Sequence, residues 1–176
     1  MKKNLILVLL CLTFGIINAQ KIQPKPFKAD IYISSVYDGD SYFGTINGVF
    51  TEMRHINFDT PEDTNKYTHR QTQPFAKTAK DSIARLILKK SFRGYVYGRD
   101  KFNRNLISIK VKRGNKLKQL YYVAIKEGWA WTYTKYQKDS SQRLMLLKVQ
   151  KIAKRRKMGL WKLQNPIEPE RWRTGV

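Results

Sequence analysis

Residues 47–62, NGVFTEMRHINFDTPE, decide the fold, because they combine a turn signal, an alternating strand and acidic residues at the strand's end. Asn47-Gly48 between two β-forming runs is a strong signal for a two-residue β-hairpin. Apolar and polar residues then alternate through Val49–Phe58, which predicts a strand with one buried face. Asp59 and Glu62 follow where that strand gives way to a loop. The stretch therefore predicts a sheet that carries negative charge at one end.

The remaining chain supplies further short strands and a few helices. Apolar residues recur at helical spacing in three segments, and Gly128 ends the second of them. An aromatic extended segment and an irregular tail complete the chain. Five strands with a helix inserted after the third match a five-stranded OB β-barrel with about three α-helices packed outside it, an α+β fold. The predicted strands are Ile31–Tyr37, Ser41–Ile46, Val49–Phe58, Ser91–Tyr97 and Arg104–Val111; the helices are Pro74–Lys89, Leu117–Ile125 and a segment capped by Ser140 or Ser141 that runs to Ala153; the extended segment is Trp129–Tyr136 and the irregular tail Pro166–Trp172.

The amino terminus has the three parts of a signal peptide. Two lysines precede an apolar run over residues 5–17, and Ala19 offers a small residue at a cleavage point. The run is too short to span a bilayer comfortably, which favours cleavage over a retained anchor. We predict a signal peptide over 1–19, a flexible leader over 20–29, a single domain over 30–163 and a tail over 164–176. The protein would then be secreted or periplasmic, without a stable membrane anchor.

The charge of the chain points to a polyanionic partner. The full sequence has 35 basic and 13 acidic residues, and removal of 1–19 takes away two lysines and no acid, which leaves a net charge of +20. Charge of this size repels itself in the folded state, so it indicates a partner that neutralises it. Nucleic acid, an acidic polysaccharide and an anionic membrane surface all fit, and nucleic acid is favoured. Cys11, the single cysteine, leaves with the signal peptide.

Acidic residues are scarce in so basic a chain, and three of them stand at predicted loop edges. Asp40, Asp59 and Glu62 are either partners for basic side chains or metal ligands, and the residues alone leave both readings open. Carboxylate oxygens suit Ca²⁺ or Mg²⁺. Zinc is disfavoured, since the mature chain has no cysteine and only two histidines.

Candidate phosphate and base contacts come from arginines and aromatic residues. Arg54 lies on the strand that ends at Asp59, and a guanidinium fits two phosphate oxygens at once. Tyr133 and Tyr136 lie among basic residues, a pattern that can stack bases. For Trp129 and Trp131 nearby, core packing is the favoured role.

Three motifs occur in order: Val36–Ser41, Arg54–Glu62 and Asp100–Arg104. Together they resemble the staphylococcal nuclease (thermonuclease) family, and Gly128–Trp131 and Gly159–Trp161 extend the likeness over nearly all of the mature chain. The resemblance implies an OB-fold nuclease that uses Ca²⁺ to hydrolyse DNA and RNA with little sequence specificity and leaves 3′-phosphate ends. Single-stranded or breathing substrate and a monomeric enzyme are expected.

The resemblance also implies a role for each matching residue. The carboxylates of the two aspartates and one backbone carbonyl would bind a single Ca²⁺, with Mg²⁺ or Mn²⁺ less favoured. A glutamate would act on the attacking water, as general base or by orienting it, and two arginines would hold the phosphate. The metal ligands are Asp40, Asp59 and Thr60; the catalytic residues are Glu62, Arg54 and Arg104; the nucleotide contacts are Lys101, Tyr136 and Tyr133.

Four positions depart from the family pattern. Ser41 replaces threonine, Phe102 and Thr134 each replace a tyrosine, and Asn103 replaces glycine at a turn where asparagine tolerates positive φ. These changes bear on substrate affinity rather than on catalytic groups.

The competing hypotheses are a noncatalytic nucleic-acid-binding OB module and a basic adhesion protein for acidic polysaccharide.

Overall fold

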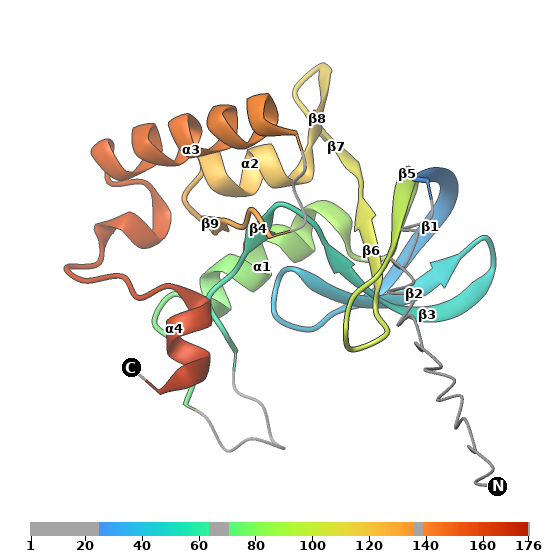
Figure 1. Cartoon of the computed structure of the whole chain (residues 1–176), viewed down its shortest axis with the longest axis horizontal. Coiled ribbons are helices and arrows are strands. Elements are labelled where there is room, and N and C mark those ends of the chain that lie inside the picture. Colours follow the sequence, from blue (N-terminus) through green and yellow to red (C-terminus); the bar gives the residue numbers. More distant parts are fainter. Residues whose placement is uncertain (1–24, 64–70, 136–138, 176) are drawn as a thin grey trace, which may run out of the picture.

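A closed β-barrel forms one side of the molecule, and the helices lie beside it (Figure 1). The computed structural model describes residues 25–63, 71–135 and 139–175. The barrel strands are hydrogen-bonded in the order β1-β2-β3-β6-β5, with β3 and β6 parallel and the other pairs antiparallel. This arrangement confirms the predicted five-stranded OB barrel. The strands are β1 (Phe27–Val36), β2 (Ser41–Ile46), β3 (Val49–His55), β5 (Lys90–Arg99) and β6 (Asn105–Ser108).

The barrel is built from hairpins whose inward side chains form the core. Asn47 and Gly48 have φ values of 50° and 83°, which is the backbone that a tight hairpin between β2 and β3 requires. Alternate residues of the strands, including Ile31, Tyr42 and Met53, are fully or almost fully buried. Each such side chain contributes about 1.5–3 kcal/mol on burial.

The helices lie outside the barrel, with α2 and α3 packed against each other (Figure 1). The first helix buries Ala79, Ile83 and Ile87 at helical spacing, which fixes the face that it turns toward the core. The third helix is capped by Asp139 rather than by one of the predicted serines. The Asp139 carboxylate accepts hydrogen bonds from the backbone N–H groups of Ser141 and Gln142. The helices are α1 (Ala76–Ile87), α2 (Leu120–Lys126), α3 (Ser140–Arg155), the 3₁₀ turn η1 (Gly159–Lys162) and α4 (Pro169–Thr174).

Two small strand pairs stand apart from the barrel. β4 (Phe58–Asp59) pairs with β9 (Trp131–Thr132), so that Asp59 lies opposite Trp131. Trp131 is 4% exposed and meets the ring of Trp161 edge-on at 5.0 Å between centroids, which confirms its packing role. The second pair joins β7 (Lys110–Arg113) to β8 (Lys116–Gln119).

Several predicted boundaries were wrong. The fifth strand divides into β6 and β7, and the segment predicted to open the second helix is the strand β8, because it pairs with β7. β1 begins at Phe27, inside the predicted leader, since Ala29 is fully buried and pairs with Gly94. The tail expected to be irregular contains α4, which begins at Pro169, where the fixed φ of proline suits a first helical turn.

Within the described ranges, no helix combines the length and apolarity needed to cross a membrane. The predicted signal peptide over 1–19 lies outside the described residues.

Gly128 and Gly159 let the end of α2 meet the start of η1. Gly128 has φ +68°, and its carbonyl accepts a hydrogen bond from the N–H of Leu160 at 2.8 Å. A Cβ atom on Gly128 would lie 2.2 Å from the Met158 carbonyl oxygen, a backbone atom with little freedom to yield. Gly114, at φ +60°, has open space around it. Gly128 and Gly114 therefore have the same left-handed backbone conformation, but only Gly128 is crowded by neighbouring atoms.

We predict that Gly128→Ala lowers the free energy of unfolding by about 3 kcal/mol or more, because overpacking adds to the cost of a left-handed backbone. Gly114→Ala, the matched control, costs only about 1–2 kcal/mol for the backbone alone. Urea denaturation of both variants measures the difference, and equal losses would contradict the close approach as its cause.

Candidate active site

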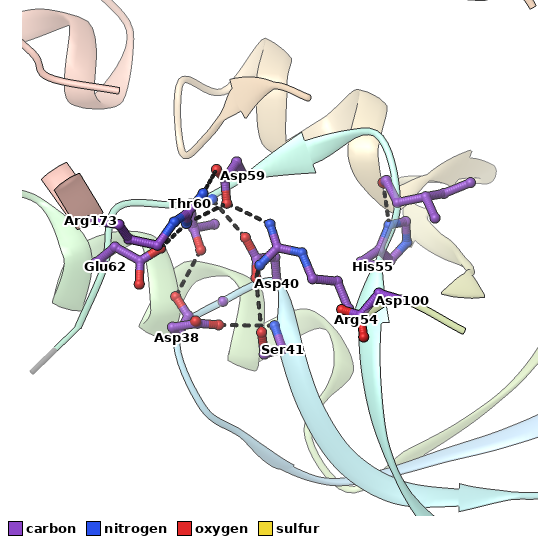
Figure 2. Close-up of polar contacts among 12 residues, drawn as sticks. Asp38, Asp40, Ser41, Arg54, His55, Asp59, Thr60, Glu62, Asp100 and Arg173 are labelled. Atoms are coloured by element: carbon purple, nitrogen blue, oxygen red, sulfur yellow. Dashed lines mark hydrogen bonds and ion pairs between the residues drawn. The ribbon is translucent and has the colours of Figure 1, made fainter. Parts of the chain in front are cut away.

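A buried guanidinium links two segments that are separate along the sequence. Arg54, at the end of β3, lies 2.8 Å from Asp40 in the turn between β1 and β2, and 2.5 Å from Asp59 in β4 (Figure 2). All three side chains are at most 8% exposed. Charges removed from water in this way require close opposite partners, so the three groups fix one another's positions.

Further hydrogen bonds join the turn of Asp40 to the segment that follows β4. The backbone N–H of Thr60 donates to Asp40 Oδ2 at 2.9 Å, and the Thr60 hydroxyl donates to the carbonyl of Asp38 at 3.0 Å. The Asp38 carboxylate accepts from the backbone N–H of Ser41 at 2.9 Å. The two predicted metal-binding aspartates are thereby brought to one place, with Thr60 beside them.

Glu62 lies at the edge of this cluster and contacts an arginine from the last helix. Arg173 of α4 forms ion pairs with the carboxylates of both Glu62 and Asp59 (Figure 2). The backbone N–H of Glu62 donates to the side-chain oxygen of buried Gln73 at 2.9 Å, which holds the loop after β4 against the segment that precedes α1. The side chain of Glu62 is 24% exposed and so remains within reach of solvent.

Arg104 reaches the cluster through a serine hydroxyl. Its guanidinium is held by Asp100 at 2.7 Å and donates to Ser41 Oγ at 3.2 Å, while that hydroxyl donates to Asp40 Oδ1 at 3.0 Å. The structure therefore brings together all six of the predicted catalytic and metal-binding residues. The backbone of Asn103, at φ 67°, tolerates its turn position as predicted.

The predicted nucleotide contacts are only partly placed. The ring of Tyr133 lies 5.6 Å from the guanidinium carbon of Arg54, so it belongs to the site. Lys101 is exposed on the loop before β6, with its ammonium 4.8 Å from the ring of Phe102. Phe102 is 66% exposed and also lies 5.4 Å from the Arg104 guanidinium. Tyr136 lies outside the described residues, so its role stays a prediction.

Comparison with known proteins agrees with this geometry. Residues 52–163, more than half of the chain, match the family described as staphylococcal nuclease homologue. The chain belongs to the staphylococcal nuclease family. The match confirms the resemblance seen in the motifs and places the chain among nuclease hydrolases, as predicted.

Several relatives carry nuclease names. A Haemophilus influenzae protein named as an uncharacterized endonuclease is 26% identical over 97% of this chain and 85% of its own length. The micrococcal nuclease of Shigella flexneri is 25% identical over 78% of this chain and 76% of its own. A probable staphylococcal-like nuclease of Oryza sativa is 33% identical over 57% of this chain, but over only 28% of its own length.

The environment of each carboxylate in this nuclease-family site sets a different proton affinity. Burial raises the pKa of Asp40 well above its usual value, and Arg54 offsets only part of that effect. Burial also acts to raise the pKa of Asp59, but the charges of Arg54 and Arg173 outweigh it and the pKa is lowered. Burial and the negative charge of Asp40 raise the pKa of Glu62 to about 7.

The charge balance of the cluster favours a cation. In the described part of the chain, ion pairs join two guanidinium groups to three carboxylates, and the buried carboxylate of Asp38 lies close enough to interact with the same charges. The charge of Arg104 is already balanced by Asp100. When all four carboxylates are ionised, the excess is two negative charges, the charge of one divalent ion. The carboxylates are those of Asp38, Asp40, Asp59 and Glu62.

The donor set also suits a hard cation. The carboxylates of Asp40 and Asp59, with a backbone carbonyl such as that of Thr60, are oxygen ligands of the kind that Ca²⁺ takes. Among the described residues, no group of three or more histidine, cysteine or acidic side chains is arranged to hold a metal. A Ca²⁺ ion held here would therefore take its remaining ligands from carbonyl and water oxygens.

The sequence did not single out Asp38 or Arg173 as site residues. Asp38 carried a weak signal, since it belongs to the Asp38-Gly39-Asp40 turn, and its buried carboxylate orders that turn. Arg173 carried none, because it lies 111 residues beyond Glu62 in a segment without hydrophobic periodicity.

His55 has the structural role that was predicted. It is fully buried, Nδ1 is 2.8 Å from the carbonyl of Ile56, and the backbone N–H of Ile109 points at Nε2 at 3.3 Å. This pattern fits a neutral ring with its proton on Nδ1, and a second proton would meet a donor. Burial accordingly lowers the pKa of His55 to about 4 from its ordinary 6.5.

The free energy of unfolding should therefore decrease as the pH is lowered, because of His55. Between pH 6.5 and 4 the unfolded chain binds a proton at this residue and the folded chain does not, so acid favours unfolding. We predict that the stability advantage of the wild type over His55→Gln shrinks by about 2 kcal/mol between pH 7.5 and pH 5. Urea unfolding of both proteins at the two pH values measures this, and a constant difference would contradict a neutral buried ring.

Proposed function

We propose that this chain is a secreted, Ca²⁺-dependent nuclease that hydrolyses phosphodiester bonds of DNA and RNA with little sequence specificity and leaves 3′-phosphate ends. The observation that carries the proposal is that Arg54 forms ion pairs with both Asp40 and Asp59. Glu62 lies beside this cluster, and the Ser41 hydroxyl connects Asp40 to Arg104. This set contains a cation site, a group for handling water and two phosphate-binding guanidiniums.

The two arginines would bind the scissile phosphate. Arg54 and Arg104 both lie within hydrogen-bond range of groups around Asp40, so their positive ends converge on one region. Negative charge grows on the phosphate oxygens during attack, and fixed donors aimed at that charge typically contribute 10²–10³ in rate for each one. A bound Ca²⁺ would supply further polarisation of a phosphoryl oxygen and a place for the water.

Glu62 would accept the proton of the attacking water. A general base works best when its pKa lies near the working pH, and the pKa of Glu62 is raised to about 7 by burial and by Asp40. The positive charge of a nearby cation would lower this value, which would keep the carboxylate ionised at neutral pH. Partial exposure of the side chain gives the water a route to it.

Groups at the rim of the site would seat the nucleotide. Tyr133 and Phe102 both lie against guanidinium groups of the site, and exposed aromatic rings can stack bases. Lys101 adds a cation on the same loop as Phe102. Stacking requires unpaired bases, so single-stranded or breathing DNA and RNA are the preferred substrates. The phenylalanine lacks the hydroxyl of a tyrosine, and affinity would rest on charge and ring area.

Secretion and a monomeric state complete the proposal. They rest on the amino-terminal pattern over residues 1–19 and on a site that uses residues of one chain only. The positive charge of the chain would draw the polyanion to a site that is itself acidic, and binding should weaken as salt rises.

We predict that the mature chain degrades DNA and RNA in millimolar Ca²⁺ and loses this activity in chelator. Glu62→Gln should lower kcat by about 10²–10⁴ because it removes the base. Exposed Glu52 on β3 offers a matched control, and Glu52→Gln should retain wild-type activity. Digestion assays with end-group analysis measure the rates and the position of the phosphate.

Binding measurements separate the proposal from a noncatalytic module. Glu62→Gln should still bind single-stranded DNA with nearly wild-type affinity, since the arginines remain. If the wild type binds DNA but cannot cleave it at any Ca²⁺ concentration, the protein is a binding module and the proposed function is wrong.

A further inference from the structure

The carboxyl-terminal helix places a cation directly on the site. The Arg173 guanidinium lies 3.0 Å from Asp59 Oδ2 and 3.4 Å from Asp59 Oδ1, and it also pairs with Glu62 (Figure 2). Its side chain is 32% exposed, whereas that of Asp59 is 3% exposed. Arg173 thus covers the open side of the cluster, opposite the buried Arg54.

The contacts of Arg173 compete with the roles proposed above. Asp59 Oδ1 is already bound to Arg54, and Arg173 takes Oδ2, so both oxygens of the carboxylate are engaged. The Glu62 oxygen that would receive a proton from water is bound to the same guanidinium. A divalent cation on Asp59 would also repel a guanidinium at this position. Arg173 in this position therefore competes with both the cation and the attacking water.

Among the described residues, two hydrogen bonds besides the ion pairs of Arg173 hold this helix and the residues just before it against the rest of the fold. Gln73 links the residues just before α4 to the site, because its side-chain amide accepts from the Glu62 N–H and donates to the carbonyl of Ile167 at 2.6 Å. The indole of Trp172 donates to the carbonyl of Gln71 at 3.3 Å. α4 has only six residues, and a helix of that length is not stable by itself in water. Its position thus depends on contacts that can be broken together.

We propose that Arg173 is an internal counterion and that α4 is a latch, which holds the carboxylates closed until a divalent cation displaces the guanidinium. This inference rests on the proposed Ca²⁺ site. In the closed form Arg173 reduces the repulsion between Asp59 and Glu62, which keeps the site assembled. Binding of the cation releases Glu62 to water and frees the tail. The cation must displace the ion pairs of Arg173, so the apparent Ca²⁺ affinity is lower than that of the open site by the free energy of those contacts.

Calorimetric titration of the mature chain with Ca²⁺ tests the latch without any substrate. Arg173→Gln should bind Ca²⁺ about fivefold more tightly than the wild type, since a partly exposed ion pair no longer competes. Arg171→Gln removes the same charge from the exposed face of the same helix and should change the affinity less than twofold. Hydrogen exchange of residues 169–175 should speed up when Ca²⁺ binds the wild type, and should already be fast in Arg173→Gln.

Equal or weaker Ca²⁺ binding by Arg173→Gln would overturn the proposal, because it would make Arg173 a neutral or positioning residue. Unchanged exchange in 169–175 on saturation of the wild type would overturn it as well, and so would the absence of Ca²⁺ binding in both proteins. DNA digestion in the same preparations keeps the two claims apart. Tighter binding without cleavage supports the latch and contradicts the nuclease, whereas cleavage with unchanged affinity does the reverse.

Discussion

The structure depends on one buried guanidinium. Arg54 can be almost fully buried only because Asp40 and Asp59 meet it at 2.8 and 2.5 Å. Breaking such a pair by removing one partner typically costs about 3–5 kcal/mol, since the other charge stays buried. The requirement fixes where the turn after β1, the end of β3 and the short strand β4 must lie. The barrel is the scaffold that lets these three chain segments coincide.

Much of this could be predicted from the sequence because the decisive features are local. The Asn47-Gly48 turn, the alternation of β3 and the Asp59–Glu62 motif are readable within a few residues, and the order of the motifs identified the six residues of the site, Arg54 among them. Strand pairing outside the barrel was not readable, since β8 has no periodicity that separates it from the start of α2. Arg173 was out of reach for a related reason. Its partners are set by tertiary packing of a tail whose sequence shows no pattern of its own.

The molecule places opposite charges in separate roles. The chain is strongly basic, which suits a polyanion, whereas the site pairs three carboxylates with two guanidiniums and has the Asp38 carboxylate close by. Phosphate and carboxylate repel each other, so under the proposed function a cation would have to neutralise this site before substrate enters. A guanidinium from the chain's own tail meets part of that requirement in the structure, and a divalent ion would meet it fully. The proposed metal dependence and the proposed closure by α4 would then have the same electrostatic origin.

The most direct test of this account is to soak crystals of the mature chain in Ca²⁺, determine the structure and identify the ion by its anomalous scattering. We expect one ion bound by carboxylate oxygens of Asp40 and Asp59, with Arg54 still in place and Arg173 withdrawn from Glu62. An ion bound elsewhere, or none at these carboxylates at saturating Ca²⁺ while Arg173 keeps its contacts, would contradict the account.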